Sequence, residues 1–173
     1  IMTGLLPPTH GVRDNGAYVL PDEATTLAEV LRGAGYETQA FVSAVVLARR
    51  YGLAQGFDGY DDDLWAEDTP RMFMIRDRPA DRTVDRVLAW YESWRGTAER
   101  RPFFVWLHLF APHQPYRPPA DLAMLCPTAY DAEIAAADRA LGRLVERLRS
   151  DGVLDDTLVV VTADHGESLG EHG

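Results

Sequence analysis

Lysine is absent from this chain, since all 17 basic side chains belong to arginine. Any site chemistry that needs a lysine amine must therefore be supplied from outside these 173 residues. Cysteine occurs once, at Cys126, which excludes an internal disulfide and a zinc site built from several cysteines. The 27 acidic residues outnumber the basic ones and give a net charge of −10, so we expect no nucleic-acid partner.

Long hydrophobic runs are also missing. The longest, 103–110 and 158–163, are far shorter than the roughly 20 residues that span a bilayer, so we expect no transmembrane segment within this chain. The chain starts at Ile1 without a signal-like leader and stops in a polar, Gly-rich stretch directly after a hydrophobic run. With 46% hydrophobic and 25% charged residues, the composition is that of a folded protein. We therefore expect residues 1–173 to form a single, partial domain of a longer chain.

Hydrophobic spacing and capping signals predict helices in three parts of the chain. The stretch Thr26-Leu27-Ala28-Glu29 has the sequence of a capping box, and the glycines that follow predict a helix over about 26–34. A second helix is expected to begin with Asp81 as its cap and to carry an apolar stripe as far as Trp94, whose aromatic residues we assign to the core. A third helix is expected over about 130–150.

The predicted strands alternate with these helices. Residues 36–42 are rich in β-forming residues, while Phe103–Phe110 and Thr157–Ala163 are apolar runs typical of strands buried on both faces of a parallel sheet. Between Gly52 and Pro79 the composition predicts an irregular surface segment, with Asp61-Asp62-Asp63 in solvent. Strands that alternate with helices imply βαβ units, so we predict an α/β fold with a doubly wound, mostly parallel sheet and flanking helices.

Candidate site residues follow the two strongly apolar strands, because ligands of open parallel sheets bind beyond the carboxyl ends of the strands. Asp164 and His165 pair a carboxylate with an imidazole, which suits a divalent metal ion; alternatively, Asp164 caps the next turn and His165 is simply exposed. His113 lies between prolines and could donate to an anionic oxygen, or it could be an ordinary loop residue. We interpret His108, inside the apolar strand, as a core histidine.

Five short phrases, spread over nearly the whole chain, carry a family resemblance. They are Thr3 to Val12 (TGLLPPTHGV), Gly35 to Thr38 (GYET), Gly56 to Asp58 (GFD), His113 to Tyr116 (HQPY) and Asp164 to Glu167 (DHGE). In this order and rough spacing they resemble the sulfatase family of the alkaline phosphatase superfamily. The resemblance implies an alkaline phosphatase-like fold and metal-dependent hydrolysis of sulfate esters, with an anionic ester as substrate. Hydrolysis or transfer of phosphate or phosphonate esters on the same fold, or a non-catalytic binding remnant, are the alternatives.

The resemblance also implies roles for individual residues. Asp164 and His165 look like metal ligands, and His113 looks like a catalytic imidazole that contacts the ester oxygens or the leaving group. Asn15 matches a position that contacts the substrate anion, while we interpret His10 as structural. The nucleophile, often a formylglycine made from Cys or Ser, is expected upstream of Ile1, so the segment alone is expected to be inactive. Members of the family are commonly exported to the periplasm or anchored to a membrane, which the resemblance implies here as well.

Two departures from the family pattern limit what the resemblance implies. Aryl sulfatases carry a lysine after the strand that follows Gly-Tyr, and Ser43-Ala44-Val45-Val46 has none, which argues against an aryl sulfate substrate. Two-zinc phosphodiesterases carry an aspartate four residues before the imidazole, where this chain has Leu109. The sequence therefore favours a site with one divalent ion. Calcium is the usual ion in the family, and His165 would also suit manganese or zinc, with magnesium as a further alternative.

Overall fold

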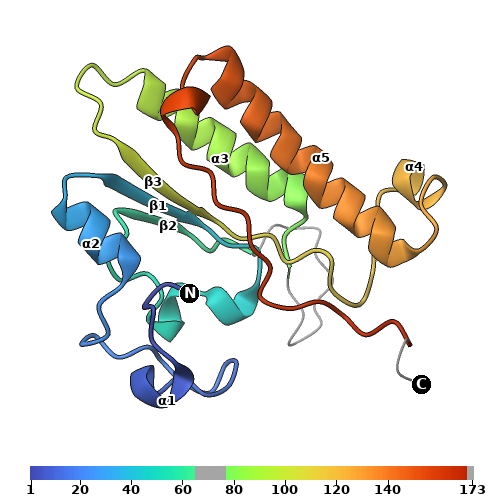
Figure 1. Ribbon diagram of the computed structural model, residues 1–173, viewed down its shortest axis with the longest axis horizontal. Helices are drawn as coiled ribbons and strands as arrows, with labels where there is room; N and C mark the ends of the chain where they lie inside the picture. The colour runs from blue at the N-terminus through green and yellow to red at the C-terminus, as the bar shows by residue number, and fades with distance from the viewer. Residues whose placement is uncertain (65–76, 171–173) are drawn as a thin grey trace. The chain divides into compact units, whose positions relative to one another are not determined.

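The computed structural model describes residues 1–64 and 77–170, which fall into two compact units, Ile1–Phe110 and Ala111–Gly173 (Figure 1). The first unit contains α1 (Pro7–His10), α2 (Leu27–Gly33), β1 (Glu37–Phe41), the 3-10 helices η1 (Val45–Leu47) and η2 (Arg49–Tyr51), β2 (Gly59–Asp61), α3 (Ala80–Arg95) and β3 (Phe103–Leu107). The second contains α4 (Ala120–Ala123), α5 (Ala129–Ser150) and η3 (Leu154–Asp156). Among the described helices, none combines the length and hydrophobicity needed to cross a membrane.

The described strands of the first unit form a parallel sheet in the order β2-β1-β3 (Figure 1). The central strand β1 pairs with β2 from Gln39–Gly59 to Phe41–Asp61, and with β3 from Glu37–Phe103 to Phe41–Leu107. Its position agrees with the strand predicted over 36–42. The parallel pairing confirms the predicted α/β fold class.

Helices α2 and α3 cover opposite faces of this sheet. Ala28 of α2 packs in one core cluster with Ala40 of β1 and with Phe104 of β3. Trp94 of α3 instead packs edge-on against Phe103, the preceding residue of β3, with ring centroids 4.9 Å apart. Because neighbouring residues of a strand point to opposite faces, the two helices lie on opposite sides of the sheet. The sheet is therefore doubly wound, and the aromatic residues of α3 are core residues, as predicted.

Side chains fix the start of α2 as the sequence predicts. Thr26 Oγ1 accepts a hydrogen bond from the Glu29 N–H at 3.2 Å, and Glu29 Oε2 accepts one from the Thr26 N–H at 2.7 Å, which together form the capping box. Thr26 Oγ1 also donates to the Gln55 carbonyl at 3.0 Å. The next residue, Gly56, has φ +81° and passes so close to α2 that a Cβ there would lie 2.2 Å from the Glu29 nitrogen. The Gly-Phe-Asp phrase thus has a packing reason for its glycine.

The segment predicted to be irregular between Gly52 and Pro79 contains strand β2, so that prediction is wrong in part. β2 has no strong local signal because it is short and is stabilised by its hydrogen bonds to β1. The acidic run is not simply solvated either. Asp61 is 19% exposed and accepts a hydrogen bond from Arg78 at 2.8 Å, and Asp62 accepts two from Arg49 at 2.9 Å. Residues 65–76 of the segment lie outside the described residues.

The second and third predicted helices are present, with one correction. α3 begins at Ala80 with Pro79 at the N-cap position, so Asp81 lies in the first turn and not at the cap. Its carboxylate there still interacts favourably with the helix dipole. α5 covers Ala129–Ser150, close to the predicted 130–150, and begins at the N-cap Thr128.

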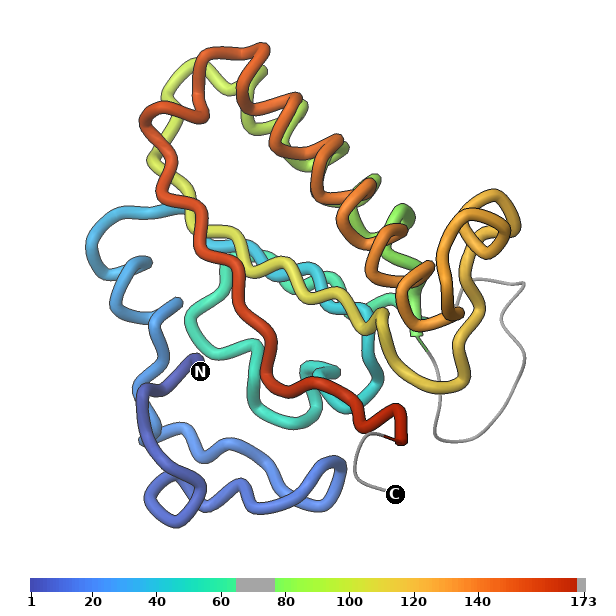
Figure 2. Tube along the Cα trace, turned by 45° about the vertical axis from the view of Figure 1, so that its right-hand side comes forward, coloured from blue at the N-terminus to red at the C-terminus, as the bar shows by residue number. Residues whose placement is uncertain are grey.

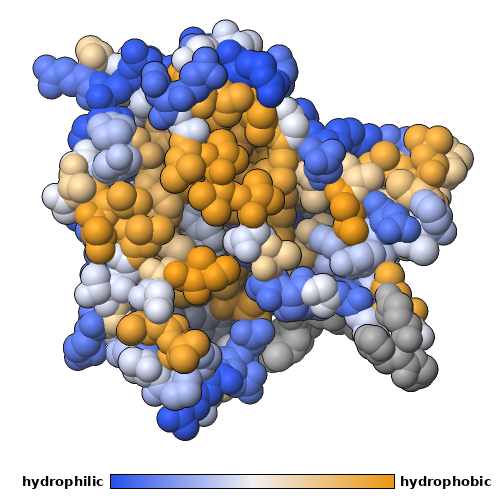
Figure 3. All heavy atoms as spheres, in the orientation of Figure 1, coloured by the Kyte–Doolittle hydropathy of each residue, from blue (hydrophilic) through white to orange (hydrophobic). Residues whose placement is uncertain are grey.

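The strand predicted over 157–163 is not formed in the described structure. The segment runs as an extended trace after η3 (Figure 2), and the side chains of Leu158 and Val160 are 90% and 75% exposed. A parallel strand needs a hydrogen-bonded neighbour, and the described part of the second unit holds no strand with which this segment could pair. Broad hydrophobic areas are visible on the face shown in Figure 3, and Leu158 to Val161 are among the exposed apolar residues of the protein.

Candidate functional site

His113 lies in a loop of the second unit that is held by a carboxylate of α5. Glu133 is only 8% exposed, and its two oxygens accept hydrogen bonds from the backbone N–H groups of His113, at 3.3 Å, and of Arg117. The imidazole of His113 is exposed, and its Nδ1 lies 2.6 Å from the Gln114 carbonyl oxygen. Because a carbonyl can only accept, Nδ1 carries a proton, and Nε2 is the nitrogen that can meet a substrate.

Asp164 and His165 follow the extended segment 157–163, and both side chains are exposed. Asp164 Oδ1 accepts a hydrogen bond from the His165 N–H at 3.1 Å, and His165 Nδ1 lies 2.9 Å from the Gly166 carbonyl oxygen. The Gly166 carbonyl, and after it the Asp164 carboxylate, raises the pKa of His165 above its ordinary value. The bond to Gly166 assigns a proton to Nδ1, so Nε2 is the nitrogen suited to a metal ion.

Tyr116 links the loop of His113 to the segment of Asp164 and His165. Its hydroxyl donates a hydrogen bond to Glu167 Oε2, and its ring packs edge-on against Tyr130 of α5 with centroids 5.8 Å apart. The bond to Glu167 raises the pKa of the Tyr116 phenol. The structure thus brings together two phrases that are distant in the sequence.

The donor atoms of Asp164 and His165 suit a divalent cation in kind. Carboxylate oxygens are common ligands of calcium, manganese, magnesium and zinc ions, and an imidazole Nε2 is a common ligand of zinc. A complete shell takes roughly four to eight ligands. Within residues 1–64 and 77–170, no group of three or more His, Cys, Asp or Glu side chains is arranged to hold a metal ion. The side chains of Asp164 and His165 alone are fewer than the ligands that a complete metal site takes.

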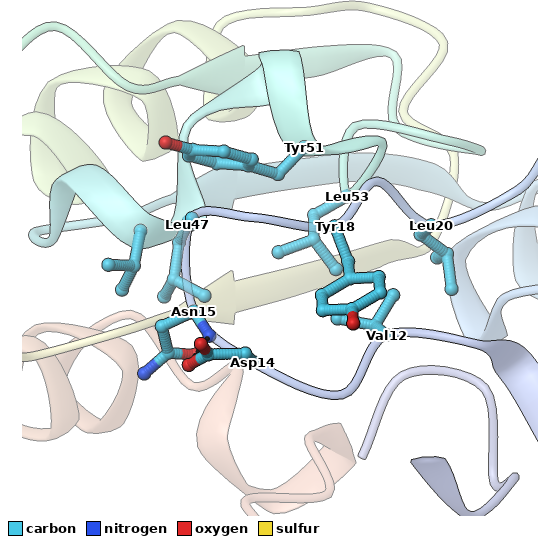
Figure 4. Close-up of a pocket in the computed structure, with 10 residues that line it drawn as sticks. Val12, Asp14, Asn15, Tyr18, Leu20, Leu47, Tyr51 and Leu53 are labelled. Atoms are coloured by element: carbon cyan, nitrogen blue, oxygen red, sulfur yellow. Dashed lines mark hydrogen bonds between the residues drawn. The ribbon is translucent and has the colours of Figure 1, made fainter. Parts of the chain in front are cut away.

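Asn15 belongs to the first unit, where its loop lines a cavity of about 180 Å³ (Figure 4). Its backbone N–H donates a hydrogen bond to Oδ1 of the Asp14 carboxylate at 2.7 Å. In Figure 4 the Asn15 and Asp14 side chains lie next to one another, and Tyr18 and Tyr51 lie along other parts of the lining. The structure therefore places Asn15 at a cavity and in a different unit from His113, Asp164 and His165.

His108 follows directly after β3, not inside it as predicted, and is half-buried with structural hydrogen-bond partners. Ser43, fully buried just after β1, donates to the His108 carbonyl at 2.8 Å and lies 3.3 Å from His108 Nδ1. Its hydroxyl also accepts from the Phe110 N–H at 2.7 Å, so it joins the carboxyl ends of β1 and β3. His10 Nδ1 likewise accepts from the Val12 N–H, at 3.2 Å, which agrees with its structural interpretation.

Sequence reasoning missed the parts played by Glu133 and Ser43. The only sequence signal for Glu133 is weak: it is a carboxylate between the apolar residues Ala132 and Ile134 near the start of the predicted third helix. Nothing in the sequence indicates that its oxygens bind a loop some 20 residues upstream, since that contact depends on how the loop folds back.

The sequence matches the family model described as Sulfatase over residues 1–173. Among curated proteins, the endo-4-O-sulfatase of Bacteroides thetaiotaomicron is 27% identical over 97 residues, which are 40% of this chain and 19% of that protein. Among solved structures, Ps i-CgsB in complex with k-i-k-neocarrahexaose is similar with a TM-score of 0.67 and 20% identity, over 88% of this chain and 43% of that one. BT4656 in complex with its substrate D-glucosamine-2-N,6-O-disulfate is similar with a TM-score of 0.64 and 16% identity, over 90% and 52% of the two chains.

These comparisons confirm the resemblance carried by the five phrases. The two structural similarities show the fold, which is an alkaline phosphatase-like α/β fold. This chain spans about half the length of each of the two solved chains. The family model covers every residue of the sequence. The chain therefore belongs to the sulfatase family.

Proposed function

We propose that the full-length protein hydrolyses sulfate esters with the help of a divalent cation bound in part by Asp164 and His165. One observation supports this proposal most. Within a chain matched throughout by the sulfatase family model, the Tyr116–Glu167 hydrogen bond joins the loop of His113 to the segment of the two candidate ligands. An imidazole and metal-binding side chains are among the groups that stabilise the charge developing on an anionic ester during hydrolysis.

Each of these side chains has a part in the proposed reaction. When bound, the cation would polarise the ester oxygens and lower the pKa of the attacking group. Asp164 binds it through a carboxylate oxygen, and His165 binds it through Nε2 while Nδ1 stays on the Gly166 carbonyl. His113 keeps Nδ1–H on the Gln114 carbonyl and presents Nε2 to the leaving-group oxygen. Asn15 stays a predicted contact of the substrate anion, and a formylglycine is the nucleophile that the family resemblance predicts.

A sulfated saccharide is the proposed substrate, and calcium the proposed ion, with manganese, zinc and magnesium as alternatives. The similar solved structure BT4656, whose substrate is D-glucosamine-2-N,6-O-disulfate, supports a saccharide, and the absence of lysine in the stretch 43–46 argues against an aryl sulfate. Export or membrane anchoring remains a prediction of the family resemblance.

Metal content and substrate choice of the full-length protein test the proposal. We expect close to one divalent ion per chain by elemental analysis and release of sulfate from sulfated glucosamine. Asp164→Asn should lower the bound metal and reduce the rate by about a hundredfold or more. Asp155→Asn, an exposed aspartate of η3, removes the same charge and should change neither.

Three results would contradict the proposal in different ways. Wild-type protein with less than about a tenth of an equivalent of any divalent ion would refute the metal site and favour a binding remnant. Hydrolysis of phosphate or phosphonate esters without release of sulfate would favour the alternative activity on the same fold. An Asp164→Asn variant with unchanged metal content would remove Asp164 from the ligand set.

A further inference from the structure

We propose that Glu133 of α5 is the positioning residue of the catalytic imidazole His113. Its carboxylate holds both ends of the loop from which that imidazole projects. This inference rests on the proposed function in one respect, since His113 is taken as the imidazole that meets the leaving group.

The contacts of Glu133 are those of a buried anchor. The side chain is 8% exposed, one oxygen accepts from the His113 N–H at 3.3 Å, and the other accepts from the Arg117 N–H. Burying a carboxylate is costly unless hydrogen bonds compensate, and bonds from N–H groups to a charged acceptor are stronger than neutral ones. The five-residue loop therefore keeps both of its ends on one rigid helix.

The same loop carries the side chains of His113 and Tyr116. The His113 ring is oriented by Gln114 inside the loop, and the Tyr116 hydroxyl reaches Glu167 beside the candidate metal ligands. A displaced loop would move both at once. A shift of about 1 Å in a catalytic group can lower the rate about a hundredfold, so an anchor at this point would control catalysis without touching the substrate.

Variants of Glu133 in the full-length protein test this role. Glu133→Gln keeps the size and one acceptor oxygen but presents an NH₂ group to one of the two backbone donors, and Glu133→Ala removes both acceptors. Glu146→Gln is the matched control, because it neutralises a carboxylate on the same helix that is 66% exposed. We expect amide hydrogen exchange at His113 and Arg117 to accelerate about tenfold or more in Glu133→Ala, and to be unchanged in the control.

Kinetics separate positioning from a general loss of stability. Glu133→Gln should lower kcat by about tenfold to a hundredfold with little change in KM, because the substrate still binds while the imidazole is misplaced. In a His113→Ala background the same substitution should lower kcat by less than about twofold, since no imidazole is left to misplace. A purely structural role would give the same fold-change in both backgrounds.

The positioning role of Glu133 and the catalytic role of His113 can be refuted independently. Unchanged exchange at His113 and Arg117 in Glu133→Ala, or equal losses of kcat with and without the imidazole, would overturn the positioning role of Glu133. If His113→Ala itself leaves kcat unchanged while the exchange of its amide responds to Glu133, the anchor is supported and the catalytic role of His113 fails.

Discussion

Replacing Gly56 by alanine should destabilise the first unit more than a backbone penalty alone would. Gly56 has φ +81°, a conformation that costs an L-residue about 1–2 kcal/mol. The added Cβ would also lie 2.2 Å from the nitrogen and 2.6 Å from the Cγ of Glu29, in the first turn of α2. An overpacked contact of this kind costs about 1–3 kcal/mol, so the expected loss in the free energy of unfolding is about 2–5 kcal/mol.

The backbone at Gly56 cannot easily move away from α2, because two hydrogen bonds restrain it. Thr38 Oγ1 donates to the Gly56 carbonyl at 2.8 Å, and Thr26 Oγ1 donates to the carbonyl of the preceding residue, Gln55, at 3.0 Å. Both threonines are buried. Relief of the clash must therefore break the capping box of α2 or one of these bonds.

Gly35→Ala is the matched control for this substitution. Gly35 has φ +90°, yet a Cβ there would have no described atom within 4 Å, so the expected loss is the backbone penalty of about 1–2 kcal/mol. Urea unfolding followed by tryptophan fluorescence measures both, since Trp106 lies beside Phe57 in the same core. Equal losses for the two variants would refute the argument that the approach of the glycine to α2 decides this position.

Two further predictions concern the first unit. Arg78→Ala should lower the free energy of unfolding by about 3–5 kcal/mol because it leaves the half-buried Asp61 without its 2.8 Å partner, whereas Arg86→Ala, whose contact with Asp61 is longer and exposed, should cost about 0–1 kcal/mol. Urea midpoints of the two variants check this, and comparable midpoints would contradict it. Burial, and then the charge of Asp62, raises the pKa of Tyr60, whose hydroxyl donates to the Leu47 carbonyl at 2.6 Å. The unfolded chain then loses this proton first, so the free energy of unfolding should fall above about pH 10 by close to 1 kcal/mol per pH unit. Tyr60→Phe should reduce that slope in unfolding curves measured from pH 9 to 11.5, a range in which this chain has no lysine to titrate and in which Tyr116 supplies a remaining slope of the same sign; an unchanged slope would refute the assignment.

Local signals were sufficient where the determining contacts are close in sequence. The capping box at Thr26 and Glu29 predicted the start of α2, and apolar spacing predicted α3 and α5 to within a few residues. The short phrases identified the family and the segments that carry His113, Asp164 and His165. These features could be predicted because helix caps, turns and short sequence motifs depend on residues within about one helical turn of each other.

Contacts between distant segments decided the rest. β2, with the sequence Gly-Tyr-Asp, is a strand because it pairs with β1, while the far more apolar segment 157–163 is paired with no strand in the described structure and remains extended and exposed. Asp61 is half-buried because Arg78 reaches it, and the His113 loop is held because Glu133 of α5 accepts its backbone N–H groups. The sequence by itself determined which residue types are present and how short segments fold. Tertiary structure alone decided which of these segments contact one another. Strand pairing, burial of charge and loop anchoring each depend on an interaction free energy between residues that no local sequence pattern connects.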